Sequence, residues 1–218
     1  MSIEIKKCAV LGAGVMGAQI AGHIANAGIP SLLFDINEEL AQKGVDGLSK
    51  LKPAPLFSCF NKALVTPCTY DNVLEKLSDC ALIIESVAEK IEIKHAVYKN
   101  LLPHLKKGVI LASNTSGIPL ANLVEVLPED IQKSFLIAHF FNPPRYLKLL
   151  ELVKGEKTSE QVYETMTEFG ETTLGKGIVH AKDTPGFIGN RLINAGGPLT
   201  YHKAVEMGLT VEDVDALS

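Results

Sequence analysis

The sequence has no excess of positive charge, no long apolar run and no repeated segment, and each absence removes a class of protein. Its 21 Lys and Arg stand against 25 Asp and Glu, so a net charge of −4 offers no basic surface for nucleic acid or an anionic membrane. No run of about 18 apolar residues could span a bilayer. Glycines interrupt the first apolar run too early for a signal peptide. We therefore predict a protein with no nucleic-acid partner and no membrane span.

Cysteine is scarce, and its spacing is typical of a protein kept reduced. The four cysteines show neither CxxC spacing nor the density of a secreted disulfide scaffold; they are Cys8, Cys59, Cys68 and Cys80. We predict structural thiols, no metal site and a cytoplasmic location.

Short apolar runs, separated by helical patterns, indicate the fold. The runs have little polar alternation, as expected for strands that are covered on both faces. They are residues 7–11, 31–35, 81–85, 109–112 and 135–140. Helical patterns follow the first run and cover residues 90–105 and 119–127. This alternation predicts an α/β fold, a Rossmann-like, doubly wound and mostly parallel sheet.

The last third of the sequence predicts two more strands and a change of architecture. The strands are expected at residues 147–153 and 177–181, with a helix from 159 to 174 between them. Thr158 and Gln161 are typical of a capping box at its start, and Gly175 of its end. Residues 51–66 break the pattern and are expected to form a loop or a helical excursion.

The turn sequence DTPG, residues 183–186, marks a predicted boundary between two domains. Residues 1–184 are expected to form the nucleotide-binding domain. Residues 185–218 are helical in pattern and too few for a core of their own. We interpret them as the truncated start of an all-helical second domain.

The sequence GAGVMG, residues 12–17, predicts a phosphate-binding loop, because it follows a strand and opens a helix. Gly12 permits the tight turn, Gly14 lets the backbone approach a pyrophosphate, and Gly17 packs the helix on the strand. Val15 and Met16 complete the candidate cofactor-binding loop. A dinucleotide-free glycine turn and an FAD site stay open as alternatives at this point.

Asp35 ends the second predicted strand, where a carboxylate can accept hydrogen bonds from a ribose 2′-hydroxyl. The same carboxylate would repel the 2′-phosphate of NADP, and no arginine is adjacent. We therefore predict NAD as the cofactor.

Polar residues also follow three later strands, at the edge where doubly wound sheets bind ligands. Glu89 and Lys94 follow the third run, Ser116 lies in SNTSG after the fourth, and His139 is near the end of the fifth. The alternatives are a solvated helix start for the first pair and a simple capping turn for SNTSG.

Glu151 shares a predicted strand face with aliphatic residues, where an unpaired carboxylate is costly. His139 is a suitable partner, because a carboxylate on one ring nitrogen leaves the other nitrogen as a general base. A structural histidine with a glutamate paired elsewhere is the alternative.

Four motifs in succession resemble the 3-hydroxyacyl-CoA dehydrogenase family. They are GAGVMGAQIA from residue 12, ASNTSG from residue 112, HFFNPP from residue 139, and KDTPGFIGNRL from residue 182. The stretch HFFNPPRYLKLLE resembles the large multidomain members that act in fatty-acid β-oxidation. The resemblance implies NAD-dependent oxidation of 3-hydroxyacyl-CoA to 3-oxoacyl-CoA.

The resemblance also implies roles for residues. His139 is then the general base, Glu151 orients it, and Ser116 bonds the substrate oxygen or the nicotinamide. Asn190 matches an active-site asparagine of the family. The positions that line the cofactor or the active site match Glu89, Lys94 and Asn142.

Two departures from the family pattern affect what the resemblance implies. The excursion that carries CoA contacts in the family aligns poorly here, with Ser49, Lys50 and Lys52 as its candidate substrate contacts. The family's dimerising helical domain is mostly absent from the sequence. The partners implied are a 3-hydroxyacyl-CoA substrate and either a second copy of the chain or the rest of a multifunctional β-oxidation protein.

Three other functions stay open from the sequence. A β-hydroxyacid dehydrogenase of the hydroxyisobutyrate type has a similar glycine loop, but it uses a catalytic lysine and gives His139 and Glu151 no role. A non-catalytic NAD-binding protein, similar to the lens crystallins of this family, is the second. A fragment that serves a multienzyme complex by interaction is the third.

Overall fold

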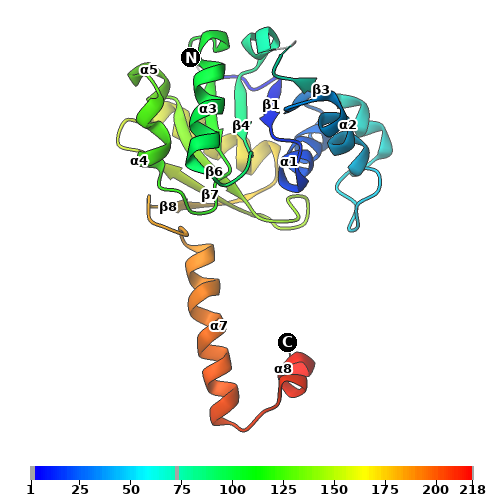
Figure 1. Cartoon of the computed structure of the whole chain (residues 1–218), viewed down its shortest axis with the longest axis vertical. Helices are drawn as coiled ribbons and strands as arrows, with labels where there is room; N and C mark the ends of the chain where they lie inside the picture. The colour runs from blue at the N-terminus through cyan, green and yellow to red at the C-terminus, as the bar shows by residue number, and fades with distance from the viewer. Residues whose placement is uncertain (1–2, 72–73, 218) are drawn as a thin grey trace.

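The five apolar runs of the sequence form neighbouring strands of one eight-stranded sheet (Figure 1). The computed structural model describes residues 3–71 and 74–217. The strand order is β3-β2-β1-β4-β5-β6-β7-β8, and the first six run parallel. The bounds are β1 Cys8–Leu11, β2 Ser31–Asp35, β3 Val65–Thr69, β4 Leu82–Glu85, β5 Ile110–Ser113, β6 Phe135–Phe140, β7 Leu149–Lys154 and β8 Gly177–Ala181. The predicted Rossmann-like fold is confirmed.

One strand differs from the prediction. Residues 51–66 were expected to form a loop or a helical excursion, and they do include a 3₁₀ helix, η1, at Cys59–Leu64. The edge strand β3 begins at Val65, however, and pairs in parallel with β2. Its sequence VTPCT contains Pro67, which has no N–H to donate to a ladder. An edge strand tolerates such a residue, whereas the apolar-run criterion does not detect it.

Helices cover both faces of the sheet (Figure 1). One face packs against α1, α2 and α6, and the other packs against α3, α4 and α5. The α-helices before residue 180 are α1 Val15–Asn26, α2 Glu38–Gly47, α3 Ile91–Leu101, α4 Leu120–Leu123, α5 Glu129–Gln132 and α6 Glu160–Glu168. The other short helices are η2 Leu74–Asp79, η3 Leu102–His104, η4 Val124–Val126 and the π-helix η5 Phe169–Thr173.

The predicted cap of α6 is displaced by one residue. The Ser159 side chain, and not that of Thr158, accepts a hydrogen bond from the Val162 amide at the helix start. The Thr158 hydroxyl instead accepts from the Gly155 amide and donates to the Phe135 carbonyl at 2.6 Å. Thr158 therefore ties the turn after β7 to β6. Gly175 follows the helix with φ +65°, the conformation expected of a glycine stop.

The reversal between β6 and β7 brings the two predicted catalytic residues together. The two strands are antiparallel, and His139 is the register partner of Glu151. Both lie on the sheet face that α3 covers, because their neighbours Ile137 and Val153 pack in the core on that side. The tight turn at residues 143–147 thus returns the chain to the same edge of the sheet.

After β8 the chain leaves the sheet and continues in helices α7, Gly189–Glu206, and α8, Val211–Leu217. Figure 1 shows α7 extending away from the sheet, with α8 beside its far end. The two helices expose many large apolar side chains: Leu192, Ile193, Leu199, Tyr201, Val205, Met207, Val211 and Leu217. The prediction that this part of the chain is helical is confirmed. Across residues 3–71 and 74–217, no helix has the length and apolar character needed to cross a membrane.

Candidate functional site

The glycine loop fits the role predicted for it. Gly12 has φ +99°, and a Cβ there would lie 2.6 Å from the Ser86 carbonyl oxygen. A Cβ on Gly17 would overlap the Gly12 carbonyl oxygen, so the first turn of α1 can pack on the loop only without a side chain. A Cβ on Gly14 would meet nothing within 4 Å. The loop therefore packs tightly at Gly12 and Gly17 and is open at Gly14, where a pyrophosphate can approach the backbone.

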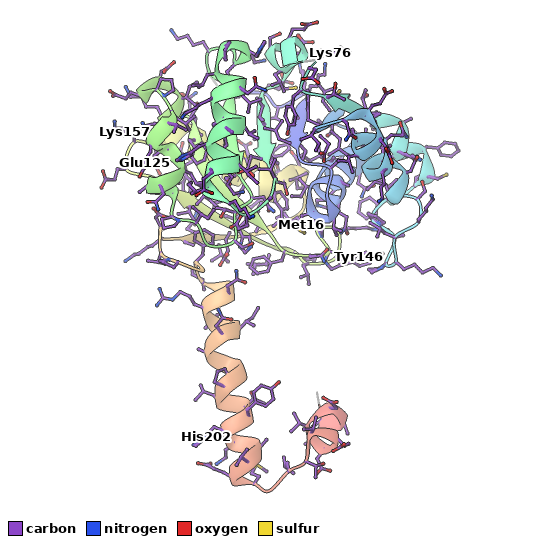
Figure 2. All side chains as sticks on the ribbon, viewed as in Figure 1. Met16, Lys76, Glu125, Tyr146, Lys157 and His202 are labelled. Atoms are coloured by element: carbon purple, nitrogen blue, oxygen red, sulfur yellow. The ribbon has the colours of Figure 1, made fainter. Side chains whose placement is uncertain are left out.

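The start of α1 offers donors to an anion. Gly14 caps the helix without a side-chain hydrogen bond, and the first turn contains no acidic residue. Unpaired amides and the positive end of the helix dipole suit a pyrophosphate. Val15 is exposed and Met16 half-buried. Figure 2 shows Met16 in the lower half of the sheet-containing part of the molecule, on the side where α7 extends away.

Asp35 closes the loop from the neighbouring strand. Its Oδ2 accepts from the Ala13 amide at 2.7 Å, and its Oδ1 accepts from the Ile36 amide at 2.7 Å. A pocket of about 420 Å³ begins beside it. The lining residues are Ile36, Asn37, Glu38, Pro67, Cys68, Thr69 and Asp71. The carboxylate, the open loop and this pocket lie at the carboxyl ends of neighbouring parallel strands, where the dinucleotide is predicted to bind.

His139 and Glu151 form a buried hydrogen-bonded pair. The imidazole Nδ1 lies 2.7 Å from Oε2 of Glu151, with the two side chains 5% and 0% exposed. The other carboxylate oxygen accepts from the Ile188 amide at 3.0 Å and the Gly189 amide at 2.7 Å, at the start of α7. Glu151 is thus fully partnered, while Nε2 of His139 has no hydrogen-bond partner within the described residues.

Aromatic rings enclose the imidazole. The Phe141 ring centroid lies 4.5 Å from that of His139, and the Phe187 centroid lies 5.7 Å away. Phe187 is buried and has φ +45°, an uncommon backbone conformation for a bulky residue. The residues that lead into α7 therefore pack against the His139–Glu151 pair.

Ser116 and Asn190 meet beside this pair. The Asn190 Nδ2 donates to the Ser116 carbonyl oxygen at 3.1 Å. Ser116 is exposed, and with Glu89 it lines an open pocket of about 640 Å³ at the same edge of the sheet. The structure thus gathers the predicted catalytic residues around one edge, drawing them from β6, β7, the loop after β5 and α7.

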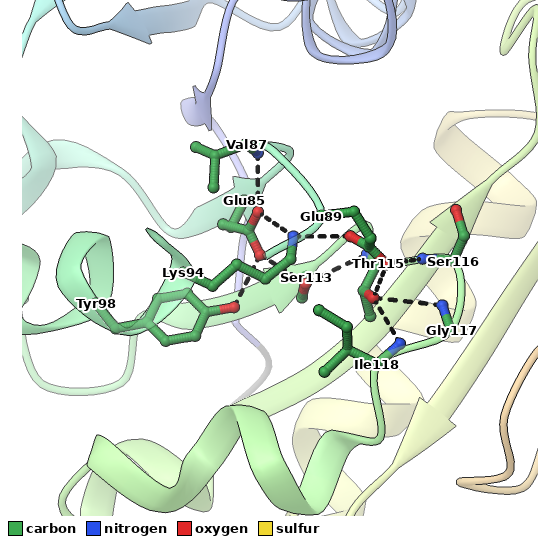
Figure 3. Close-up of polar contacts among 10 residues, drawn as sticks. All are labelled: Glu85, Val87, Glu89, Lys94, Tyr98, Ser113, Thr115, Ser116, Gly117 and Ile118. Carbon is green, nitrogen blue, oxygen red and sulfur yellow. Dashed lines mark hydrogen bonds and ion pairs between the residues drawn. The ribbon is translucent and has the colours of Figure 1, made fainter. Parts of the chain in front are cut away.

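A charged network lies beneath Ser116 (Figure 3). The Glu89 Oε1 accepts from the Ser116 amide at 2.9 Å and from the Thr115 hydroxyl, while Lys94 Nζ lies 3.2 Å from the other oxygen. Burial alone would raise the pKa of Glu89, but the Thr115 and Ser116 hydrogen bonds and the Lys94 charge together lower it. Glu89 is therefore ionised at neutral pH. Lys94 itself is only 1% exposed.

The residue at the centre of this network, Glu85, was not predicted from the sequence. It ends β4 as the last letter of the apolar run ALIIE, and it is fully buried. Lys94 and Tyr98, four residues apart on α3, both contact it. That spacing, after a carboxylate that ends a strand, is the signal that could have identified it.

The remaining predicted residues lie in the turn after β6 and in the segment after α2. The Asn142 Oδ1 accepts from Gln19 Nε2 at 3.0 Å, which ties the turn after β6 to α1. Ser49, Lys50 and Lys52 are exposed on the segment that follows α2. Their roles stay predictions.

Comparison with known proteins identifies the family. The sequence model of the 3-hydroxyacyl-CoA dehydrogenase NAD-binding domain matches residues 7–184. A protein of Deinococcus radiodurans named "Probable 3-hydroxyacyl-CoA dehydrogenase" is 43% identical over 99% of this chain and 64% of its own length. A fatty acid oxidation complex subunit alpha of a Psychrobacter species is 35% identical over 87% of this chain and 27% of its own.

Solved structures agree with this assignment. The crystal structure of 3-hydroxybutyryl-CoA dehydrogenase from Escherichia coli has a TM-score of 0.82 and 30% identity, over 95% of this chain and 44% of that one. The site and fold define an NAD-binding Rossmann protein, and the predicted cofactor is confirmed. The chain belongs to the 3-hydroxyacyl-CoA dehydrogenase family. It spans less than two thirds of the length of the two curated relatives.

Proposed function

We propose that this protein oxidises 3-hydroxyacyl-CoA thioesters to 3-oxoacyl-CoA with NAD, using His139 as the general base. The observation that carries the proposal is the 2.7 Å contact between His139 Nδ1 and Glu151, in a buried site where no described residue bonds Nε2. The hydrogen bond to the carboxylate fixes which ring nitrogen carries the proton. Nε2 then presents a lone pair to a substrate hydroxyl.

In the proposed reaction, Nε2 of His139 takes the proton of the 3-hydroxyl as the C3–H bond releases its hydride. NAD, when bound, supplies the nicotinamide ring that accepts this hydride. The products are the 3-oxoacyl thioester and NADH, and the proton remains on His139. The Glu151 carboxylate stabilises the resulting imidazolium, because opposite charges attract strongly in a buried site. Ser116 and Asn190 lie where they can orient the substrate oxygen.

The structure also bears on the alternative functions. A dehydrogenase that relies on a lysine has no use for a buried, oriented imidazole, and a binding protein has no use for a free Nε2. The only lysine of the network, Lys94, is held between two carboxylates. The pairing of His139 with Glu151 therefore favours the 3-hydroxyacyl-CoA reaction.

We further propose a setting for this reaction. The whole protein works in fatty-acid β-oxidation, as a homodimer or within a larger multifunctional protein, as the name of the Psychrobacter relative suggests. The domain boundary lies between residues 184 and 185. Four free cysteines, three of them buried, are consistent with the reducing cytoplasm.

The test is NADH production from 3-hydroxybutyryl-CoA by the natural full-length protein and its His139→Gln variant. We expect the variant to lose activity while its affinity for NAD, measured by calorimetry, stays close to that of the wild type. His202→Gln is the matched control, because this histidine lies on α7 and its side chain is 76% exposed. Retained turnover in His139→Gln, or loss of NAD binding, would overturn the assigned role.

A further inference from the structure

Glu85 is a fully buried carboxylate whose hydrogen-bonding capacity is completely used. Its Oε1 accepts from Lys94 Nζ at 2.7 Å and from the Val87 amide at 2.8 Å. Its Oε2 accepts from the Ser113 hydroxyl at 2.7 Å and the Tyr98 hydroxyl at 2.8 Å. A buried charge with four donors is held in one position, and it has no capacity left for a substrate. Glu85 therefore acts only through its neighbours.

Lys94 links Glu85 to a second carboxylate, Glu89, that lies nearer the surface. Its ammonium lies between Oε1 of Glu85 and Oε2 of Glu89, and its side chain is 1% exposed (Figure 3). A buried ammonium is stable only with such partners, since the loss of hydration of an unpaired buried charge is strongly unfavourable. Lys94 thus connects a carboxylate inside the core to one that is 45% exposed.

Glu89 in turn holds the loop that carries Ser116. One of its oxygens accepts from both the Thr115 hydroxyl and the Ser116 amide. The Thr115 hydroxyl also accepts from the Ile118 amide at 3.0 Å, which fixes the rest of the turn. The Ser116 carbonyl is fixed from the opposite side by Asn190. No hydrogen bond from the residues that the structure describes engages the Ser116 hydroxyl, so it can meet a ligand.

We propose that Glu85 is a positioning residue for the reaction, setting the place of the Ser116 hydroxyl through Lys94 and Glu89. This inference rests on the proposed function, because it assigns Ser116 to the substrate. Removal of the Glu85 charge leaves Lys94 with Glu89 as its one carboxylate. The ammonium then draws Glu89 inward, and the Ser116 amide moves with it. A shift of this kind affects the transition state more than the binding of NAD.

The test compares Glu85→Gln, Ser116→Ala and the double variant in the full-length protein. Glutamine keeps the size of the side chain and removes its charge. We expect kcat to fall on the order of 10- to 100-fold in Glu85→Gln, with the KM for NAD little changed. If Glu85 acts through Ser116, the double variant loses much less than the product of the two single losses. Glu125→Gln, an exposed carboxylate on η4, is the control for charge loss alone.

A second variant covers the case in which Glu85→Gln does not fold. Tyr98→Phe removes one donor to Glu85 and leaves both charges in place, so a smaller fall in kcat is expected, again non-additive with Ser116→Ala. Multiplicative losses in the cycles, or unchanged kcat in a folded Glu85 variant, would show that Glu85 is merely structural. In both of those outcomes the wild type is active and His139→Gln is not. A wild type that makes no NADH overturns the proposed function itself, and this inference with it.

Discussion

Glu85 and Glu151 are two fully buried carboxylates on the same face of one sheet, and they differ in what their partners leave free. Glu85 is bound to Lys94, whose ammonium is committed to a second carboxylate, so its network is closed. Glu151 is bound to His139, whose other nitrogen has no partner in the described residues, so its network is open. Burial and pairing alone therefore do not mark a catalytic carboxylate. We expect a catalytic carboxylate to have a partner with one unused functional atom, as Glu151 has in His139.

The largest expected effect is on the open network. Glu151→Gln keeps the size of the side chain but removes the charge that stabilises the His139 imidazolium. We expect kcat to fall about 100- to 10,000-fold, the range typical of lost general base support. Steady-state kinetics with 3-hydroxybutyryl-CoA measure this, with calorimetry to confirm NAD binding. A Glu151→Gln loss no larger than that of Glu85→Gln would break the comparison.

His23 extends the comparison to a buried base with an unpartnered nitrogen. Its Nε2 lies 3.1 Å from the Leu174 carbonyl oxygen, whereas its Nδ1 has no partner in the described residues. Burial first, and then the positive charges of Lys176 and Arg145, lower the pKa of His23 to about 4 from 6.5, despite the opposing effect of Leu174. Between pH 4 and pH 6.5, His23 is therefore mostly neutral in the folded protein and mostly protonated in the unfolded chain.

The contribution of the lowered His23 pKa to the free energy of unfolding should be complete above pH 6.5 and should be lost as the pH falls toward 4. At about 1.4 kcal/mol for each pH unit, the loss is about 3 kcal/mol. Urea unfolding between pH 7 and pH 4 measures it. His23→Gln should flatten this part of the profile, while His202→Gln should leave it unchanged. Equal slopes in wild type and His23→Gln would contradict the expectation.

Asp35 is a partly buried carboxylate, unlike Glu85 and Glu151. A variant at this position tests whether such a carboxylate serves the cofactor. Asp35→Arg removes the acceptor for the Ala13 amide and for a ribose hydroxyl, and it introduces a positive charge. We expect NAD affinity to fall on the order of 10- to 100-fold, as for lost hydrogen bonds to a charged group. Calorimetry measures the change, with Glu39→Arg on α2 as the charge control. Unchanged affinity would mean that the glycine loop holds another ligand.

The smallest expected effect concerns the amides that complete Glu151. A Cβ on Gly189 would lie 2.6 Å from Cζ of Phe141, so Gly189→Ala should move its amide away from the carboxylate. We expect about a 10-fold fall in kcat. Gly196→Ala, farther along α7, is the matched control because its Cβ would meet nothing within 4 Å. Equal kinetics in the two variants would show that Glu151 does not need this donor.

The sequence predicts the open network better than the closed one, for a physical reason. Period-two alternation indicates that Glu151 needs a partner, and the resemblance to the family names His139 as that partner. The structure places the two as register partners. Glu85 reads as the end of an apolar run, and its partners Lys94 and Ser113 are 9 and 28 residues away. Only the packing of α3 against β4 and β5 assembles them.

The same distinction explains the missed elements. Strands buried on both faces are apolar throughout, and five of the strands were predicted on that basis. β3 was missed because it contains Pro67, a residue that argues against a strand and is tolerated only at places such as a sheet edge. The cap of α6 was assigned one residue early because Thr158 and Ser159 are both capping residues. The Thr158 hydroxyl is engaged by the Gly155 amide and the Phe135 carbonyl, and Ser159 therefore caps the helix.

The two amides that donate to Glu151 from the start of α7 lie beyond the stretch that matches the family's NAD-binding domain. The match to the model of that domain ends at residue 184, and the donors lie at Ile188 and Gly189. A protein engineer who excised residues 7–184 would keep the glycine loop, Asp35 and His139. We expect such a piece to bind the dinucleotide, whereas one oxygen of Glu151 would have lost its donors. Any useful cut through this protein therefore belongs beyond the first turn of α7.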